Sequence, residues 1–166
     1  MPHADLIVPS FDLKHSGALD FKDFLKMFKG FFKKYDYDVD EKLYDTKTDS
    51  TGSKTTIIKW ACDKKVDDYN KIFIKPSIIL NSYKEAVVDG VKVIDGNLKV
   101  NIKVEIERDY DEKWKVSPVL RFFRSLYEKY VSDEKQDKIT KEAKSVFENL
   151  KKELKQYLNV WGKSFI

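Results

Sequence analysis

Hydrophobic residues near the start of the chain recur at the spacing of one helical face. Within 20–35 they stand at offsets 0, 3, 4, 7, 10, 11 and 14, which is the stripe of an amphipathic helix. The residues are Phe21, Phe24, Leu25, Phe28, Phe31, Phe32 and Tyr35. Asp20 precedes them in the position of an N-cap. The pattern predicts a helix over 20–35, and Gly30 inside it suggests that a neighbouring element approaches closely there.

From about residue 36 to residue 116 the hydrophobic period changes to two. The clearest stretch alternates five apolar residues with lysine, asparagine and glutamate. The five are Leu98, Val100, Ile102, Val104 and Ile106. A strand of this kind has one buried face and one face in water, which indicates an antiparallel sheet. Further strands are expected at 5–11, 37–48, 54–62, 69–75, 77–83 and 91–94.

Glycine and proline punctuate this region. The Asp-Gly pair at 89–90 and the Asp-Gly-Asn triplet at 95–97 both predict turns between apolar runs. Pro76 is expected to bend or end the strand that contains it, because proline cannot donate to a strand ladder. For the same reason Pro9 restricts 5–11 to an edge or terminal strand.

Helical spacing returns in the last third of the chain. Pro118 follows a serine N-cap and predicts a helix over 118–131. A longer helix is predicted over 133–161, with acidic residues near its start and lysines near its end. Its stripe contains Ile139, Ala143, Val146, Phe147, Leu150, Leu154, Tyr157, Leu158 and Trp161.

These elements together predict an α+β fold. We expect an antiparallel β-meander of five to seven strands packed against the long C-terminal helix, with an amphipathic N-terminal helix. The chain of 166 residues contains no linker or repeat, so 1–166 is expected to form a single domain. Residues 1–15 are a candidate mobile N-terminal segment within it.

Composition narrows the class of protein. No apolar run approaches the ~18–20 residues that a membrane span needs, and one cysteine cannot form an internal disulfide, so a cytoplasmic protein is expected.

The 32 basic residues exceed the 28 acidic residues by four. Only three of the basic residues are arginines, which weakens the nucleic-acid interpretation because base readers favour arginine forks.

Motifs for catalysis and for metal binding are weak. Gly52-Ser53-Lys54-Thr55 lacks the glycine spacing of a phosphate loop and is interpreted as a polar hairpin turn. Two histidines and Cys62 do not supply a zinc set, and Cys62 stands in an apolar strand as an inert thiol. The densest carboxylate group, at 109–112, is interpreted as a charged loop rather than an acid–base pair. The sequence predicts no catalytic residue, metal site or cofactor.

The polar side of the 20–35 helix carries a row of lysines. They are Lys22, Lys26, Lys29 and Lys33. One interpretation is an ordinary helix whose lysines face water; the other is a basic surface that contacts an anionic partner. We name these four residues the lysine row.

The order of elements over nearly the whole chain resembles the helix-grip fold of START-like (polyketide cyclase or Bet v 1 type) domains. The resemblance is carried by a strand at 5–11, a helix at 20–35, an antiparallel meander at 37–116 and a long terminal helix at 133–161. It implies a curved sheet that wraps around the terminal helix and encloses an apolar cavity. Fold alone does not fix function.

Two functional classes follow from this resemblance and from the composition. The first is a non-catalytic binding domain that holds an apolar or amphipathic molecule between the sheet and the C-terminal helix. Its candidate ligand contacts are Phe28, Phe32, Trp60, Phe147 and Leu150. The second is a protein-interaction or assembly module with a filled core, acting through the lysine row or the 118–131 helix. The sequence leaves the oligomeric state open.

Overall fold

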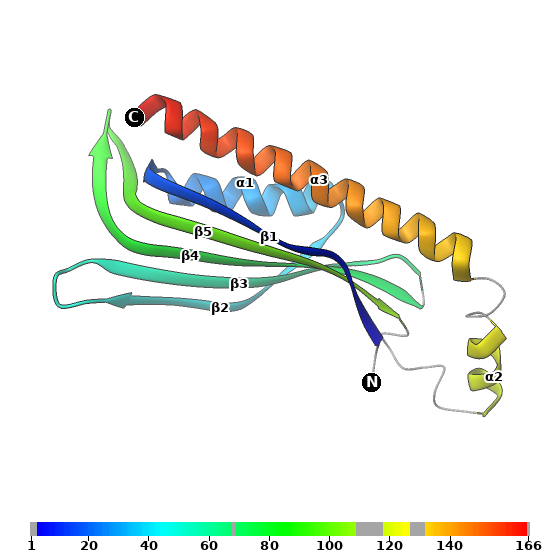
Figure 1. Ribbon diagram of the computed structural model, residues 1–166. Helices are drawn as coiled ribbons and strands as arrows, with labels where there is room; N and C mark the ends of the chain where they lie inside the picture. Colours follow the sequence, from blue (N-terminus) through cyan, green and yellow to red (C-terminus); the bar gives the residue numbers. More distant parts are fainter. Residues whose placement is uncertain (1–2, 68, 109–117, 127–131, 166) are drawn as a thin grey trace.

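The computed structural model describes residues 3–67, 69–108, 118–126 and 132–165 (Figure 1). It shows an α+β fold with a five-stranded antiparallel sheet, as the sequence predicts. The elements in chain order are β1 (His3–Leu19), α1 (Phe21–Lys34), β2 (Asp38–Thr48), β3 (Lys54–Lys65), β4 (Asn70–Val88), β5 (Val91–Arg108), α2 (Pro118–Leu126) and α3 (Ser132–Phe165).

The sheet has the strand order β1-β5-β4-β3-β2, and α1 and α3 lie on the same face of it (Figure 1). β1 is an edge strand, which agrees with the prediction made from Pro9. α1 covers β3 through Phe28 and Trp60, whose ring centroids are 5.3 Å apart. α3 covers β1 through Phe147 and Phe11, whose rings meet edge to face at 6.1 Å. The opposite face of the sheet carries no described helix.

The predicted core faces are confirmed on both the sheet and the helices. All five alternating residues of β5 are buried. Of the predicted helical stripes, five residues are only partly buried against the core, namely Phe21, Leu25, Tyr35, Tyr157 and Trp161, and the others are buried. From α1 these are Phe24, Phe28, Phe31 and Phe32, and from α3 they include Val146, Phe147, Leu150, Leu154 and Leu158. A continuous apolar layer therefore joins one sheet face to two helices.

The structure confirms the predicted N-cap of α1 but not the close neighbour predicted at Gly30. The Asp20 carboxylate accepts a hydrogen bond from the backbone N–H of Asp23 at 3.1 Å, which is the geometry of an N-cap. Gly30 is exposed, and a Cβ added there would meet nothing within 4 Å. The expected close neighbour at Gly30 was therefore wrong.

Two predicted interruptions of the sheet were also wrong. β4 runs without a break through Pro76, because pairing to β5 continues on both sides of that residue. β5 likewise runs through 95–97 as one strand, and the only connection between β4 and β5 is the predicted Asp-Gly turn at 89–90. The segment expected as a short strand at 91–94 is the beginning of β5.

The triplet at 95–97 marks a bend instead of a turn. The register of β4 against β5 shifts between Asn81 and Lys84, which is a β-bulge. Opposite the bulge, a Cβ on Gly96 would lie 2.6 Å from the Cβ of Tyr83 and 2.8 Å from its Cα, so only glycine permits this approach. Beyond this point the paired ends of β4 and β5 turn up toward the side of the helices (Figure 1).

The two glycines give a matched test of this description. Gly96→Ala should destabilise the fold by roughly 1–3 kcal/mol, because the new methyl group collides with the backbone of Tyr83. Gly30→Ala should stabilise it by roughly 0.5–1 kcal/mol, because the methyl group meets nothing and the helix loses its most flexible residue. Urea unfolding of both variants measures the two values. Equal effects at the two positions would contradict the close approach at Gly96.

Candidate binding groove

An open groove of about 610 Å3 lies at the end of the sheet where β4 and β5 turn up. Its walls come from this hairpin, from the first turn of α1 and from neighbouring positions on β2 and β3. The apolar and aromatic residues that line it are Phe21, Tyr44, Tyr83, Ala86, Val87, Val91, Val93 and Ile94. The bend at Gly96 positions the hairpin wall, so the groove depends on the bulge described above.

Exposed hydrophobic side chains gather in this groove. Tyr44, Val87 and Val91 are 55%, 68% and 46% exposed, and each lines it. Single exposed apolar residues are ordinary on a protein surface, but a contiguous group around a concavity is typical of a binding site. The groove thus exposes apolar surface to water, and no other described residue covers that surface.

Hydroxyl groups form a polar wall beside the apolar lining. The Thr56 hydroxyl lies 3.0 Å from the Tyr83 hydroxyl and 2.9 Å from the Thr46 hydroxyl. Either member of each pair can be the donor, so the chain of three hydroxyls across β2, β3 and β4 can reverse its direction. Thr56 and Tyr83 line the groove and can present a donor or an acceptor to a bound molecule.

The acidic side chains at the rim are already engaged. Asp20 caps α1, the Tyr157 hydroxyl donates to Asp23 at 2.6 Å, and Glu85 forms an ion pair with Lys54 at 3.5 Å. The two rim lysines are Lys22 and Lys92. Neither forms an ion pair with any described residue. The rim therefore offers two cations, whereas its carboxylates have partners within the protein.

The contact between Tyr157 and Asp23 joins α3 to the start of α1. Burial raises the pKa of the Tyr157 phenol, and so does its hydrogen bond to the Asp23 carboxylate, so the hydroxyl stays protonated as a donor. The rings of Tyr157 and Phe24 also pack with centroids 5.8 Å apart. These contacts hold the first turn of α1 against α3 and so fix one wall of the groove.

The five predicted ligand contacts lie in the core. The centroid of the Phe28 ring lies 5.6 Å from that of Phe32 and 5.3 Å from that of Trp60. Phe147 and Leu150 are buried on α3. None of the five lines the groove. Their role in ligand binding stays a prediction.

The lysine row is exposed along its whole length, and its members differ in their surroundings. Lys22 lines the groove. The Lys29 ammonium lies 5.3 Å from the centre of the Trp60 ring, a cation–π contact that covers this buried tryptophan. The row therefore meets the groove only at its N-terminal end.

Sequence reasoning missed the hairpin residues that form the groove wall. Their signal was the run from Ala86 to Ile94, in which apolar residues stand on both sides of the Asp-Gly turn with few charges between them. A hairpin tip in water is usually polar, so this run indicates apolar surface at the tip. That this run forms a groove wall depends on the bulge, and no sequence motif identified the bulge.

The described residues contain no group of possible metal ligands. Cys62 is fully buried, and burial raises the pKa of its thiol, as expected of an inert cysteine. Residues 3–67, 69–108, 118–126 and 132–165 contain no cluster of three or more His, Cys, Asp and Glu that could hold a metal. The carboxylates at 109–112 lie outside the described residues. No described helix has the length and apolar character needed to cross a membrane.

The chain was compared with known protein families, curated proteins and solved structures. No family model, curated protein or solved structure matches the chain.

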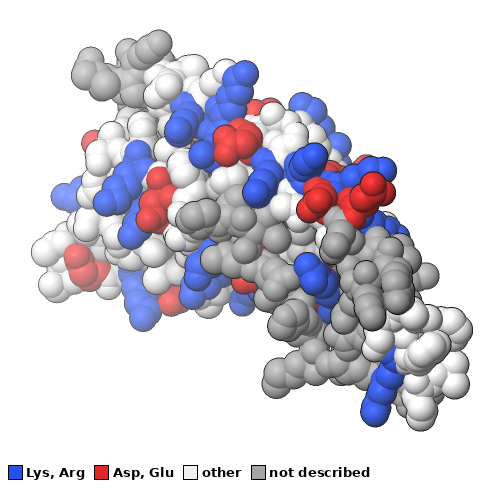
Figure 2. All heavy atoms as spheres, turned by 45° about the vertical axis from the view of Figure 1, so that its right-hand side comes forward, with Lys and Arg blue, Asp and Glu red and all other residues white. Residues whose placement is uncertain are grey.

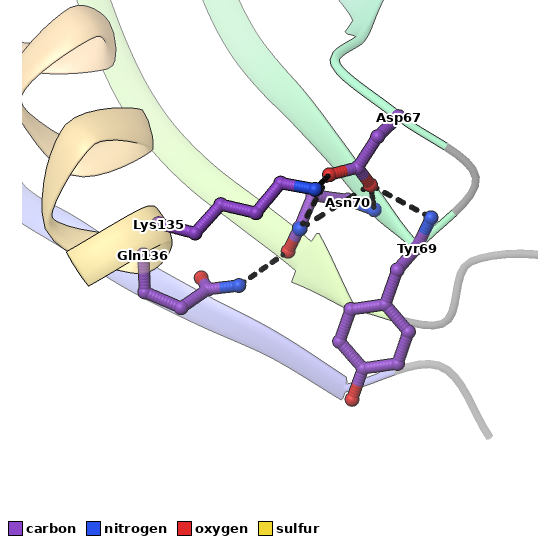
Figure 3. A network of polar contacts seen from close by, with 5 residues as sticks. All are labelled: Asp67, Tyr69, Asn70, Lys135 and Gln136. Atoms are coloured by element: carbon purple, nitrogen blue, oxygen red, sulfur yellow. Dashed lines mark hydrogen bonds and ion pairs between the residues drawn. The ribbon is translucent and has the colours of Figure 1, made fainter. Parts of the chain in front are cut away.

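A polar cluster anchors α3 at the other end of β4, next to the turn that joins β3 to β4 (Figure 3). The Asp67 carboxylate accepts hydrogen bonds from the backbone N–H groups of Tyr69 and Asn70 at 2.8 Å and 2.6 Å. It also forms an ion pair with Lys135 of α3 at 2.8 Å. Gln136 donates to the fully buried side-chain oxygen of Asn70 at 2.8 Å. The start of α3 is thus tied to the sheet by polar contacts, and its later turns by apolar ones.

This cluster lowers the pKa of Asp67. Burial alone raises the pKa of that carboxyl, but hydrogen bonds from Lys135, from the amides of Asn70 and Tyr69 and from the Asn70 side chain outweigh it. A lowered pKa in the folded state means that the unfolded state binds the proton more readily. The stabilisation is therefore present above the ordinary pKa of aspartate and is lost as the pH falls through the lower folded value.

The pH dependence of Asp67→Asn should follow this sign. The variant should be less stable than the wild type at neutral pH, and the difference should narrow below about pH 4, where Asp67 of the unfolded wild-type chain takes up a proton before the folded one does. Urea unfolding at about pH 7 and about pH 3 measures the difference. Asp137→Asn removes an exposed carboxylate from the same end of α3 and is the matched control. A difference between wild type and Asp67→Asn that is unchanged by pH would contradict the charged contact.

Proposed function

We propose that the protein binds an amphipathic small molecule without transforming it, and that the groove at the end of the sheet holds this molecule. The observation that carries the proposal is the gathering of Tyr44, Val87 and Val91, all exposed, around one concavity. The volume of about 610 Å3 falls within the ~300–1,000 Å3 typical of small-molecule sites. A curved sheet against a long C-terminal helix is also compatible with the helix-grip fold, whose resemblance first suggested a ligand-binding role.

The lining specifies the chemistry of the ligand. An apolar chain or ring system would cover Val87, Val91 and Tyr44 and remove their surface from water, at about 25 cal/mol for each Å2 buried. An anionic group at one end would lie near Lys22 and Lys92 at the rim. The hydroxyls of Thr56 and Tyr83 would orient a polar atom between the two parts.

The groove is a better place for this ligand than the layer between the sheet and α3. Phe28 of α1 already packs against Phe32 and against Trp60 of β3, and Leu150 of α3 is fully buried in the same core. A ligand would have to displace these side chains, and opening a close-packed core forfeits their contacts. The groove needs no such displacement because its apolar residues face water.

A second candidate function is protein interaction through α2. This helix exposes Val119, Leu120, Phe122 and Phe123, which are 63%, 38%, 61% and 53% exposed. Figure 2 shows mostly uncharged surface, with a basic side chain within it, at the lower right where α2 lies, whereas acidic and basic side chains are interspersed over the other described parts of the visible face. An amphipathic helix of this kind is suited to the apolar groove of a protein partner, with the lysine row as a possible second contact.

One experiment distinguishes these two functions. The anionic, apolar dye 1-anilinonaphthalene-8-sulfonate should bind the native protein, and Val87→Asn should weaken its binding about tenfold by removing apolar contact in the groove. Lys22→Gln should weaken it less, since one exposed lysine contributes a modest, salt-screened attraction. Fluorescence titration measures each dissociation constant.

Two controls make the result decisive. Val160→Asn changes a valine of similar exposure, 63% against 68%, outside the groove and should leave dye binding within about twofold of the wild type. The double variant Phe122→Ser, Phe123→Ser removes the aromatic surface of α2 and should also leave it unchanged. Dye binding that is lost in the α2 variant and retained in Val87→Asn would contradict the groove and favour the second function.

A further inference from the structure

The face of the sheet opposite the helices carries a basic hollow. Its volume is about 420 Å3, and its walls come mainly from β3, β4 and β5. Four lysines line it, namely Lys59, Lys75, Lys99 and Lys103. We name these four residues the sheet-face lysines. They lie on the side of the sheet away from the ligand groove and belong to neither candidate function above.

The strand register places lysines directly opposite one another. Lys75 on β4 stands opposite Lys103 on β5, and Lys14 on β1 stands opposite Lys99 on β5. Like charges at directly opposite positions of an antiparallel pair repel and destabilise the sheet. A bound anion between these lysines would relieve the repulsion.

Among the described residues, only one of the sheet-face lysines has an ion-pair partner. Lys75 forms an ion pair with Glu105 at 2.9 Å and lies 5.3 Å from the centre of the Phe73 ring. Lys59, Lys99 and Lys103 form no ion pair with any residue in the described ranges. Three ammonium groups therefore line the same hollow without an ion pair to any described residue.

The other lining groups supply one carboxylate and several hydrogen-bonding groups. Asp12 is the single acidic residue of the lining, and its carboxylate accepts a hydrogen bond from the side chain of Asn101 at 2.7 Å. Ser77, between the lysines on β4, adds a hydroxyl that can donate to an oxyanion. The hollow thus combines ammonium, amide and hydroxyl donors in one concavity.

We propose that this hollow binds a small molecule that carries two or more phosphate groups. Lysine ammonium groups bind phosphate as point charges, and charge-assisted hydrogen bonds of this kind are stronger than neutral ones. A single phosphate would engage only part of a hollow of this volume, whereas several phosphates can reach lysines on three strands at once. Ile79 and Pro76 supply an apolar part of the lining for the remainder of the molecule.

Acidic residues around the hollow favour a compact ligand over a long polyanion. Glu105 on β5 and Asp63 on β3 both stand opposite Phe73, beyond the lysines along the strands. Asp45 stands opposite Ile57 on the β2 side. A nucleic-acid strand that crossed this face would pass these carboxylates, whereas a small polyphosphate would remain among the lysines.

Isothermal titration calorimetry with inorganic tripolyphosphate tests the proposal. The wild type should bind it, and raising the salt from about 0.05 M to about 0.3 M should weaken binding by several fold, because salt screens exposed charges. Lys99→Gln, Lys103→Gln should weaken it at least tenfold, since both lysines line the hollow. The same double variant should melt at or above the wild-type temperature without ligand, because it removes two like-charge oppositions.

A matched pair of lysines on α1 controls for net charge. Lys26→Gln, Lys33→Gln changes the charge by the same amount at exposed positions outside both concavities, and it should leave tripolyphosphate binding within twofold. Equal loss in the two double variants would overturn the site, and so would the absence of wild-type binding. A 20-nucleotide single-stranded DNA that binds more tightly than tripolyphosphate in the same titration would also overturn it, in favour of an extended polyanion.

Discussion

A sheet with one apolar face and one polar face has to cover the apolar side, and the arrangement of the other elements follows from this requirement. The inward residues of β5 are buried by two helices that pack on one side. The phenylalanines of α1 contribute most of the aromatic contacts, beginning at Phe24 and reaching Trp60 on β3. Full burial of one such ring stabilises a fold by roughly 1.5–3 kcal/mol, so this layer dominates the described contacts in free energy.

The same requirement explains why the sheet has an open end. α1 and α3 cover the middle of the sheet, where Phe28 meets Trp60, but the β4–β5 hairpin extends beyond the first turn of α1. The bulge opposite Gly96 turns the hairpin toward the helices. The turn does not bury the apolar residues at the hairpin tip, and they line a concavity instead. Gly96 permits the close approach to the Tyr83 backbone and in this way shapes the candidate binding site.

The sequence was sufficient for the layers of the fold because those depend on local periodicity. The alternation at 98–106 and the stripes of α1 and α3 each reveal a buried face without knowledge of any partner. Pro76 and Gly96 were misinterpreted because proline and glycine usually end a strand. Here pairing with strands on both sides keeps β4 and β5 continuous. Tertiary pairing overrode local preference at both positions.

The candidate sites were less predictable because both depend on register. The opposition of Lys14 and Lys99 joins residues far apart in the chain, and no local pattern reveals it. The groove likewise needs the hairpin tip, α1 and β2 at one end of the sheet. The predicted ligand contacts followed from aromatic residues on predicted inward faces, and that criterion selects the core more readily than a binding surface.

We propose that a ligand enters the open end of the sheet and leaves the layer between the sheet and α3 intact. Methyl-resolved NMR during a titration with decanoate tests this most directly, because valine, isoleucine and leucine methyl groups report on both places. We expect shifts at Val87, Val91 and Ile94, which line the groove, and none at Val146 or Leu150, which are buried on α3. Shifts concentrated at the two α3 residues, with the groove methyl groups unchanged, would contradict it and place the ligand in the core.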